Sequence, residues 1–96
     1  MWIKVTNNSG VSIKVSINQW GTGGSTEYFT IENSKDENWN RTDDSGFVMI
    51  INVLGTVTPY YVLYNSHIKV TKTAVKDLTY DVSLKPANLS YTKVNV

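Results

Sequence analysis

The sequence predicts an all-β fold: an antiparallel two-sheet β-sandwich of about nine short strands, in a single domain that covers residues 1–96. Apolar and polar residues alternate along most of the chain, which is typical of strands with one buried face. Turn-forming residues interrupt this alternation at short intervals, and no segment shows the 3.6-residue period of an amphipathic helix. A sandwich is favoured over a closed barrel because the strands lack the internal glycine kinks that small barrels need.

In the first half of the chain, the alternation predicts four strands, at residues 2–6, 11–17, 27–31 and 38–41. The Asn-Asn-Ser-Gly sequence at 7–10 predicts a tight hairpin turn between the first two strands, because Asn and Gly tolerate positive φ angles. A glycine-rich break at 21–25 and a polar loop at 32–36 separate the other strands.

Five further strands are predicted in the second half, at residues 47–53, 59–64, 67–71, 78–84 and 89–96. The first of them is apolar on both faces, so we expect it at the centre of a sheet. Residues 54–58 are expected to form the turn before Pro59, and residues 72–77 to hold one helical turn at most. The predicted core comprises the inward positions of two regular strands: Val11, Ile13, Val15, Ile17, Phe47, Met49 and Ile51.

Composition narrows the possible functions. Nine basic and eight acidic residues give a formal net charge of +1, which is too small to attract nucleic acid by charge alone. The chain contains no cysteine, which excludes disulfides, thiolate metal sites and cysteine nucleophiles. Its first residues lack the basic-then-apolar pattern of a secretory signal, so we expect a cytoplasmic protein.

No motif indicates an enzyme or a cofactor. His67 is the only histidine, and no nucleophile-elbow motif accompanies it. Asp43 and Asp44 resemble a glycosidase pair in composition, but adjacent side chains point apart, whereas the two catalytic carboxylates must flank one bond. The sequence therefore predicts a protein that is not an enzyme.

Metal binding is not predicted either. The Asp-x-Asn-x-Asn spacing that starts at Asp36 begins a calcium loop, but Arg41 and Phe47 stand where that loop needs Gly and Glu. A looser calcium site at Asp43 and Asp44 stays open as an alternative.

Aromatic rings beside neutral hydrogen-bonding groups are the remaining signal. A neutral sugar presents hydroxyls, which Asp, Asn and Arg bind, and an apolar C–H face, which stacks on an aromatic ring. Three clusters combine both kinds of group: residues 18–20, residues 37–44, and the set Tyr60, Tyr61, Tyr64, Asn65 and His67.

The second cluster is the predicted ligand site, because carboxylates, a guanidinium and amides lie there beside an indole. Together with the indole of the first cluster, the predicted site comprises Trp20, Asn38, Trp39, Asn40, Arg41, Asp43 and Asp44. One of the two carboxylates would accept hydrogen bonds from sugar hydroxyls, Asn40 and Arg41 would donate, and one indole would stack on the ring. The alternative for Trp39 is a place in the core of a small sandwich.

Three segments carry a family resemblance over roughly residues 2–64: Trp2-x-x-Val5-x-Asn7-Asn8-Ser9, Val15-x-Ile17-Asn18-x-Trp20, and Glu37-x-Trp39-x-Arg41-x-Asp43-x-x-Gly46-Phe47-Val48-Met49. In combination they resemble the small mushroom β-sandwich lectins of the galactobiose-binding Lyophyllum type. The resemblance implies a fungal cytoplasmic protein that recognises galactose-type glycans.

A fainter resemblance rests on Trp20-Gly21 after the opening strand, turn and strand, and on the run Arg41-Thr42-Asp43 before a glycine. These features are similar to aegerolysins, which are fungal lipid-binding β-sandwiches. This resemblance implies an alternative function as a lipid-binding or membrane-active defence protein, with Trp and Tyr at loop ends as interfacial anchors.

We therefore expect a non-catalytic lectin that binds neutral glycans. Single lectin sites are often weak, and multivalency strengthens them, so we also expect a homodimer or a larger homo-oligomer that acts as an agglutinin. Residues 91–94 carry little charge, and an edge strand of this kind would pair with a second chain.

Overall fold

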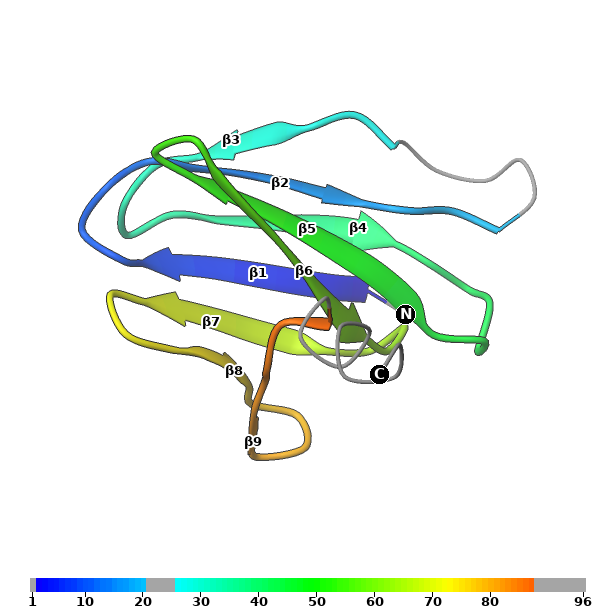
Figure 1. The fold of residues 1–96 in the computed structure, drawn as a ribbon. Coiled ribbons are helices and arrows are strands. Elements are labelled where there is room, and N and C mark those ends of the chain that lie inside the picture. Colours follow the sequence, from blue (N-terminus) through cyan, green and yellow to red (C-terminus); the bar gives the residue numbers. More distant parts are fainter. Residues whose placement is uncertain (1, 21–25, 88–96) are drawn as a thin grey trace, which may run out of the picture.

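The computed structural model describes residues 2–20 and 26–87, which form nine strands (Figure 1). The strands are β1 (Trp2–Asn8), β2 (Ile13–Ile17), β3 (Phe29–Ile31), β4 (Asp36–Asn40), β5 (Phe47–Val53), β6 (Thr56–Val62), β7 (His67–Thr71), β8 (Val75–Asp77) and β9 (Val82–Ser83).

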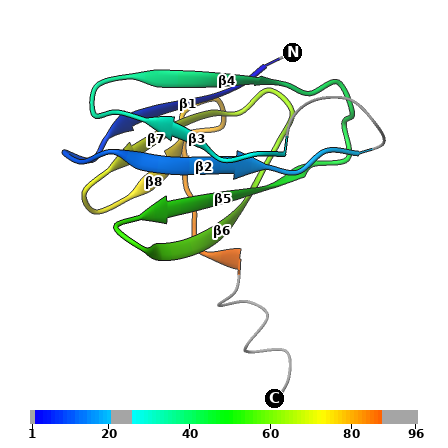
Figure 2. The same cartoon turned by 90° about the horizontal axis from the view of Figure 1, so that it is seen from above.

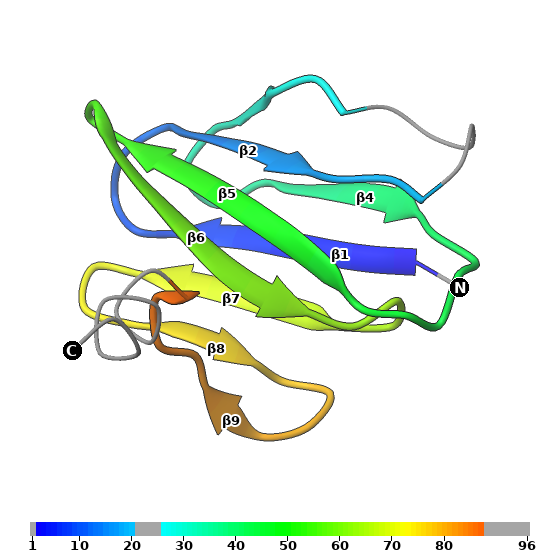
Figure 3. The same cartoon turned by 45° about the vertical axis from the view of Figure 1, so that its right-hand side comes forward.

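The strands form two sheets that pack together as a β-sandwich, which confirms the predicted fold class. One sheet has the order β4-β1-β7-β8-β9 and the other β3-β2-β5-β6. Figure 2 shows β2, β5 and β6 following one another in their sheet, and in Figure 3 β5 and β6 pass in front of the other layer. As predicted, the apolar strand β5 lies inside its sheet, between β2 and β6.

The core lies between the two sheets and consists of the alternate residues of their strands. Of the predicted core positions, the six on β2 and β5 are buried, whereas Val11 precedes β2 and is only partly buried. The remaining core is formed mainly by the other strands: Ile3, Val5, Ile31, Trp39, Val62, Ile68, Val70 and Val75.

The first strand departs from the prediction in its pairing. β1 pairs with β4 in antiparallel orientation and with β7 in parallel orientation, so the sheet is mixed rather than antiparallel. The first two strands do not form a hairpin, because β1 and β2 belong to different sheets. The turn residues Ser9 and Gly10 instead carry the chain from one sheet to the other.

A fully buried side chain, Asn7, organises this crossing. Its Nδ2 donates hydrogen bonds to the carbonyl oxygens of Val11 and Ile31, at 2.7 and 2.8 Å. Its Oδ1 accepts hydrogen bonds from the backbone N–H and the hydroxyl of Ser9, at 3.0 and 2.7 Å. All polar atoms of the amide are thus used, which offsets the cost of burying them.

The β5–β6 hairpin is shorter at its turn than predicted. Val53 pairs with Thr56, so only Leu54 and Gly55 connect the strands, with φ angles of 52° and 90°. Two positive φ angles are typical of a type I′ turn, which matches the twist of the flanking strands. Pro59, predicted to start the strand, lies within β6, where an edge position tolerates a residue without an N–H.

The C-terminal part also differs from the prediction. Residues 72–77, expected to hold one helical turn at most, contain the strand β8, in which Val75 and Asp77 face the core. Residues 78–84, expected to be one strand, contain a turn followed by the short β9. The predicted strand at 89–96, with the expected pairing edge at 91–94, lies outside the described residues.

We predict that Asn7→Ala lowers the free energy of unfolding by about 3 kcal/mol or more, because it leaves several buried polar groups without a partner. Urea denaturation measures the change. The matched control is Asn8→Ala at the exposed neighbouring position, which should stay within about 0.5 kcal/mol of the parent. Equal effects of the two substitutions would show that the buried amide does not stabilise the crossing.

We predict that Leu54→Asn stabilises the protein by about 0.5–1 kcal/mol, because Asn adopts a positive φ more readily than Leu does. Leu54→Val should lower stability, since a β-branched residue disfavours this conformation. Thermal or urea unfolding of the three proteins gives the order. An order in which Val equals Asn would contradict the described turn.

Candidate functional site

The structure distributes the predicted site residues over three places. Trp39 and Arg41 are buried, and Asn38 and Asn40 lie on the outer face of the five-stranded sheet. The loop residues of the predicted site, namely Trp20, Asp43 and Asp44, follow the ends of β2 and β4. The alternation of β4 causes the split, since successive side chains of a strand point to opposite faces.

Trp39 belongs to the core, which was the alternative to its predicted role in ligand binding. Its ring packs edge-on against Phe29, with ring centroids 5.8 Å apart. Its Nε1 is buried and has no hydrogen-bond partner among the described residues. A ring in this position cannot stack on a ligand at the surface, so the predicted stacking role of Trp39 is corrected.

Arg41 connects the two sheets at the end where the loops lie. Its guanidinium donates hydrogen bonds to the carbonyl oxygens of Ile17, Asn18 and Asn40, at 3.0, 3.0 and 3.1 Å. Desolvation by burial lowers the pKa of this guanidinium below its usual value. These bonds satisfy backbone groups at the ends of β2 and β4, so the predicted role of Arg41 as a donor to sugar is corrected to a structural one.

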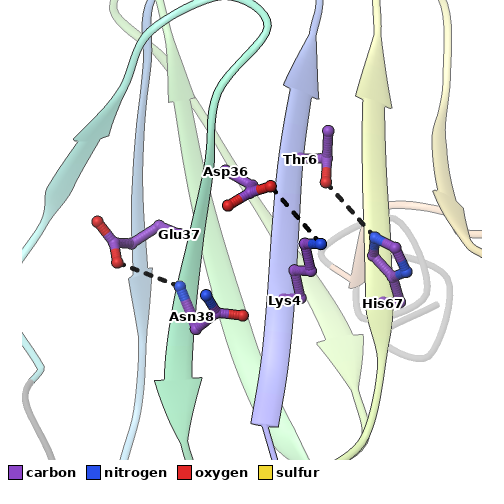
Figure 4. A network of polar contacts seen from close by, with 6 residues as sticks. All are labelled: Lys4, Thr6, Asp36, Glu37, Asn38 and His67. Carbon is purple, nitrogen blue, oxygen red and sulfur yellow. Dashed lines mark hydrogen bonds and ion pairs between the residues drawn. The ribbon is translucent and has the colours of Figure 1, made fainter.

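Asn38 and Asn40 lie on the outer face of the five-stranded sheet, where β4, β1 and β7 pair. Figure 4 shows this surface, where Lys4 and Asp36 form an ion pair at 3.6 Å. On the same face, Thr6 Oγ1 and His67 Nε2 are 3.5 Å apart, so the histidine side chain lies against a threonine.

Trp20 is held beside the loop that follows β4. Its Nε1 donates a hydrogen bond of 2.6 Å to the carbonyl oxygen of Gly46, and its ring packs at a tilt on Phe47 with centroids 6.3 Å apart. The side chain is nevertheless 50% exposed. A half-exposed ring that is already fixed in place loses little entropy when a ligand stacks on it.

The two carboxylates of this loop have different surroundings. Asp43 Oδ1 accepts a hydrogen bond of 2.8 Å from the Ser45 backbone N–H, which closes a local turn. The Ser45 hydroxyl first, and then this N–H, lower the pKa of Asp43 below its usual value of 3.8. Asp44 is exposed, and no hydrogen bond or ion pair joins it to the other described residues. Asp44 is thus the freer acceptor for a ligand.

A cavity of about 550 Å³ opens next to Trp20. Its lining is almost entirely apolar or aromatic and comes from the loop before β5, from β5 and β6, and from the β8–β9 region: Trp20, Ser45, Gly46, Phe47, Val48, Tyr61, Val62, Leu63, Asp77, Tyr80, Val82 and Leu84. Trp20 and Tyr61 belong to the clusters predicted from the sequence, whereas Tyr80 and Asp77 were not predicted. No local pattern marks these two, because the fold alone brings them to the cavity.

Metal-binding clusters and membrane-spanning helices are two features that the described residues lack. No group of three or more His, Asp or Glu side chains in this part of the chain is close enough to hold a metal ion. Nor does this part include a helix that is long and apolar enough to cross a membrane.

Comparison with protein-family models, with curated proteins and with solved structures finds no match for this chain.

We predict that Ser45→Ala raises the pKa of Asp43 toward 3.8. The substitution removes the Ser45 hydroxyl, whose hydrogen bond lowers this pKa more than the backbone N–H does. A lowered pKa in the folded state means that Asp43 adds stability above its usual pKa and loses this contribution as the pH falls through the lowered value. Carboxyl-carbon NMR titration measures the shift. Ser45→Thr retains a hydroxyl and should retain the lowered pKa; an unchanged pKa in Ser45→Ala would contradict the assignment.

Proposed function

We propose that the protein is a non-catalytic lectin that binds neutral glycans at the mouth of the cavity beside Trp20. One observation carries the proposal: the half-exposed indole of Trp20 is fixed by its hydrogen bond to the Gly46 carbonyl. Gly46 belongs to the loop that also contains the exposed carboxylates of Asp43 and Asp44. Sugar binding needs this pairing of a flat ring with acceptors for hydroxyl groups.

In this proposal the indole of Trp20 stacks on the C–H face of the sugar. Asp44 accepts hydrogen bonds from hydroxyls, and the Asp43 oxygens add acceptors that Ser45 keeps in place. Asn38 and Asn40, on the outer face of the five-stranded sheet, take no part in this proposal. A preference for galactose-type glycans rests on the sequence resemblance alone.

We predict that Asp44→Ala and Trp20→Ala each weaken glycan binding by about tenfold or more, because a charge-assisted hydrogen bond or a stacking ring is lost. A glycan array identifies the ligand, and titration calorimetry measures its affinity. Asn38→Ala, which removes an exposed amide on the outer face of the five-stranded sheet, is the matched control and should bind normally. Loss of binding in Asn38→Ala but not in the loop variants would place the sugar on that outer face instead.

The second candidate is a lipid-binding or membrane-active protein. The observation in its favour is the apolar lining of the cavity, with exposed Tyr61, Leu63 and Val82 at its surface. Exposed aromatic and aliphatic side chains of this kind suit the interface of a bilayer. Leakage from liposomes distinguishes the two functions, since a lectin responds to glycan stereochemistry and a lipid-binding protein to bilayer composition.

A lectin of this size also needs a second site to cross-link cells. We therefore propose that the protein forms a homodimer or a larger homo-oligomer, which multiplies the sites without new contacts to the sugar. Agglutination of cells tests both properties together, and sedimentation velocity separates the assembly from sugar binding.

A further inference from the structure

We propose that the cavity beside Trp20 binds an organic ammonium cation, of the choline or trimethylammonium type, with Asp77 as its counter-ion. This inference goes beyond the glycan proposal, because it concerns the lining of the cavity rather than Asp43 and Asp44, which are not among the lining residues. It rests on a buried negative charge, on the aromatic walls, and on the apolar character of the remaining lining.

The buried charge belongs to Asp77, which is 4% exposed and lines the cavity. On β8 it shares the inward face with Val75, so its side chain points between the sheets. Asp77 Oδ2 accepts a 2.6 Å hydrogen bond from the Ser66 hydroxyl, and Oδ1 accepts one of 3.1 Å from the Thr79 N–H. The carboxylate is therefore held in one orientation.

No cation in the described part of the chain compensates this carboxylate. The ion pairs there join Lys4 to Asp36 and Lys76 to Asp81, and neither involves Asp77. The described lining of the cavity includes no Lys, Arg or His. Buried charges in proteins are usually paired, because an unpaired one is costly to remove from water. A cationic ligand in the cavity would supply the missing partner.

Aromatic side chains from three separate segments line the same cavity: Trp20, Tyr61 and Tyr80. Two of them are fixed by hydrogen bonds, Trp20 to the Gly46 carbonyl at 2.6 Å and the Tyr80 hydroxyl to Asn65 Oδ1 at 2.7 Å. The faces of aromatic rings attract cations, and aromatic cages are the common device for binding quaternary ammonium groups. Rings that are fixed before binding lose little entropy when a ligand enters.

The rest of the lining selects an organic cation over a metal ion. A calcium or magnesium ion needs six or more oxygen ligands, whereas Asp77 and Ser45 are among the few oxygen-bearing side chains of a largely apolar lining. A quaternary ammonium carries its charge under methyl groups, which suit apolar walls. The volume of about 550 Å³ is ample for such a group.

The decisive experiment compares choline with 3,3-dimethylbutan-1-ol, which has the same shape but no charge. Binding of each is followed by two-dimensional amide NMR of the full chain. We expect choline to bind at least about tenfold more tightly than the uncharged alcohol, with shifts at residues of the cavity. Equal binding of the two, or no binding of choline, would overturn the proposal.

Variants locate the site. Asp77→Asn keeps the shape of the side chain and should abolish the preference for choline over the alcohol. Because this substitution also alters bonds to Ser66 and Thr79, Tyr61→Ala provides a second test at a position that is 63% exposed. It should weaken choline binding about fivefold, whereas Tyr28→Ala, the matched control at an exposed tyrosine outside the cavity lining, should not. Choline binding that is unchanged in folded Asp77→Asn and Tyr61→Ala would overturn the proposal.

Two further experiments distinguish this proposal from the glycan proposal and identify the source of the ammonium group. Asp44→Ala should bind choline normally, so a failure of the glycan proposal leaves this one intact, and the reverse also holds. The source of the ammonium group follows from vesicles of phosphatidylcholine compared with vesicles of phosphatidylglycerol. Binding to the first, in competition with free choline, indicates a lipid headgroup; binding of free choline without vesicle binding indicates a soluble ligand.

Discussion

The buried amide of Asn7 is the interaction on which the sandwich depends, because it joins both crossings between the sheets at one end. Its side chain binds the carbonyl oxygens of Val11, which precedes β2, and of Ile31, the last residue of β3. Its backbone pairs with Ser34 and Lys35. Arg41 has the same function at the opposite end, where it binds the carbonyls that end β2 and β4. The loops with Trp20 and with Asp43 and Asp44 follow these tied strand ends, so the candidate site depends on the same bonds.

The Asp residues of the two proposals differ in exposure, because Asp43 and Asp44 lie in a loop and Asp77 lies between the sheets. In the loop after β4, Asp43 and Asp44 are exposed, which suits the role that the glycan proposal gives them as acceptors for sugar hydroxyls. Asp77 is buried and bound by Ser66 and Thr79, which suits the role that the ammonium proposal gives it as a counter-ion. Trp20 lines the cavity, and both proposals give its ring a role. The same small domain thus has exposed carboxylates in one loop and a buried carboxylate between its sheets.

The sequence predicted what local alternation encodes and failed where distant segments meet. The strands β2 and β5 and their core positions were predictable because period-two alternation marks them. The parallel pairing of β1 with β7 was not, since no local signal identifies a partner so far along the chain. Arg41 was expected to donate hydrogen bonds to a sugar, yet it is buried and donates them to backbone carbonyls. Asp77 was not among the predicted site residues, and residues 72–77, expected to hold one helical turn at most, contain its strand β8.

The placement of β1 has a consequence for how the chain reaches this structure. Its two neighbours are β4 and β7, and Thr6 and His67, which lie side by side across one of these pairings, are 61 residues apart in sequence. On the ribosome, most of the polypeptide must therefore emerge before β7 can cover the second edge of β1, an interior strand of the larger sheet. Closing so long a loop costs chain entropy before any contact compensates it, which slows folding. In the meantime, the strand's open edge is exposed to other nascent chains, a hazard that a hairpin of adjacent strands would avoid.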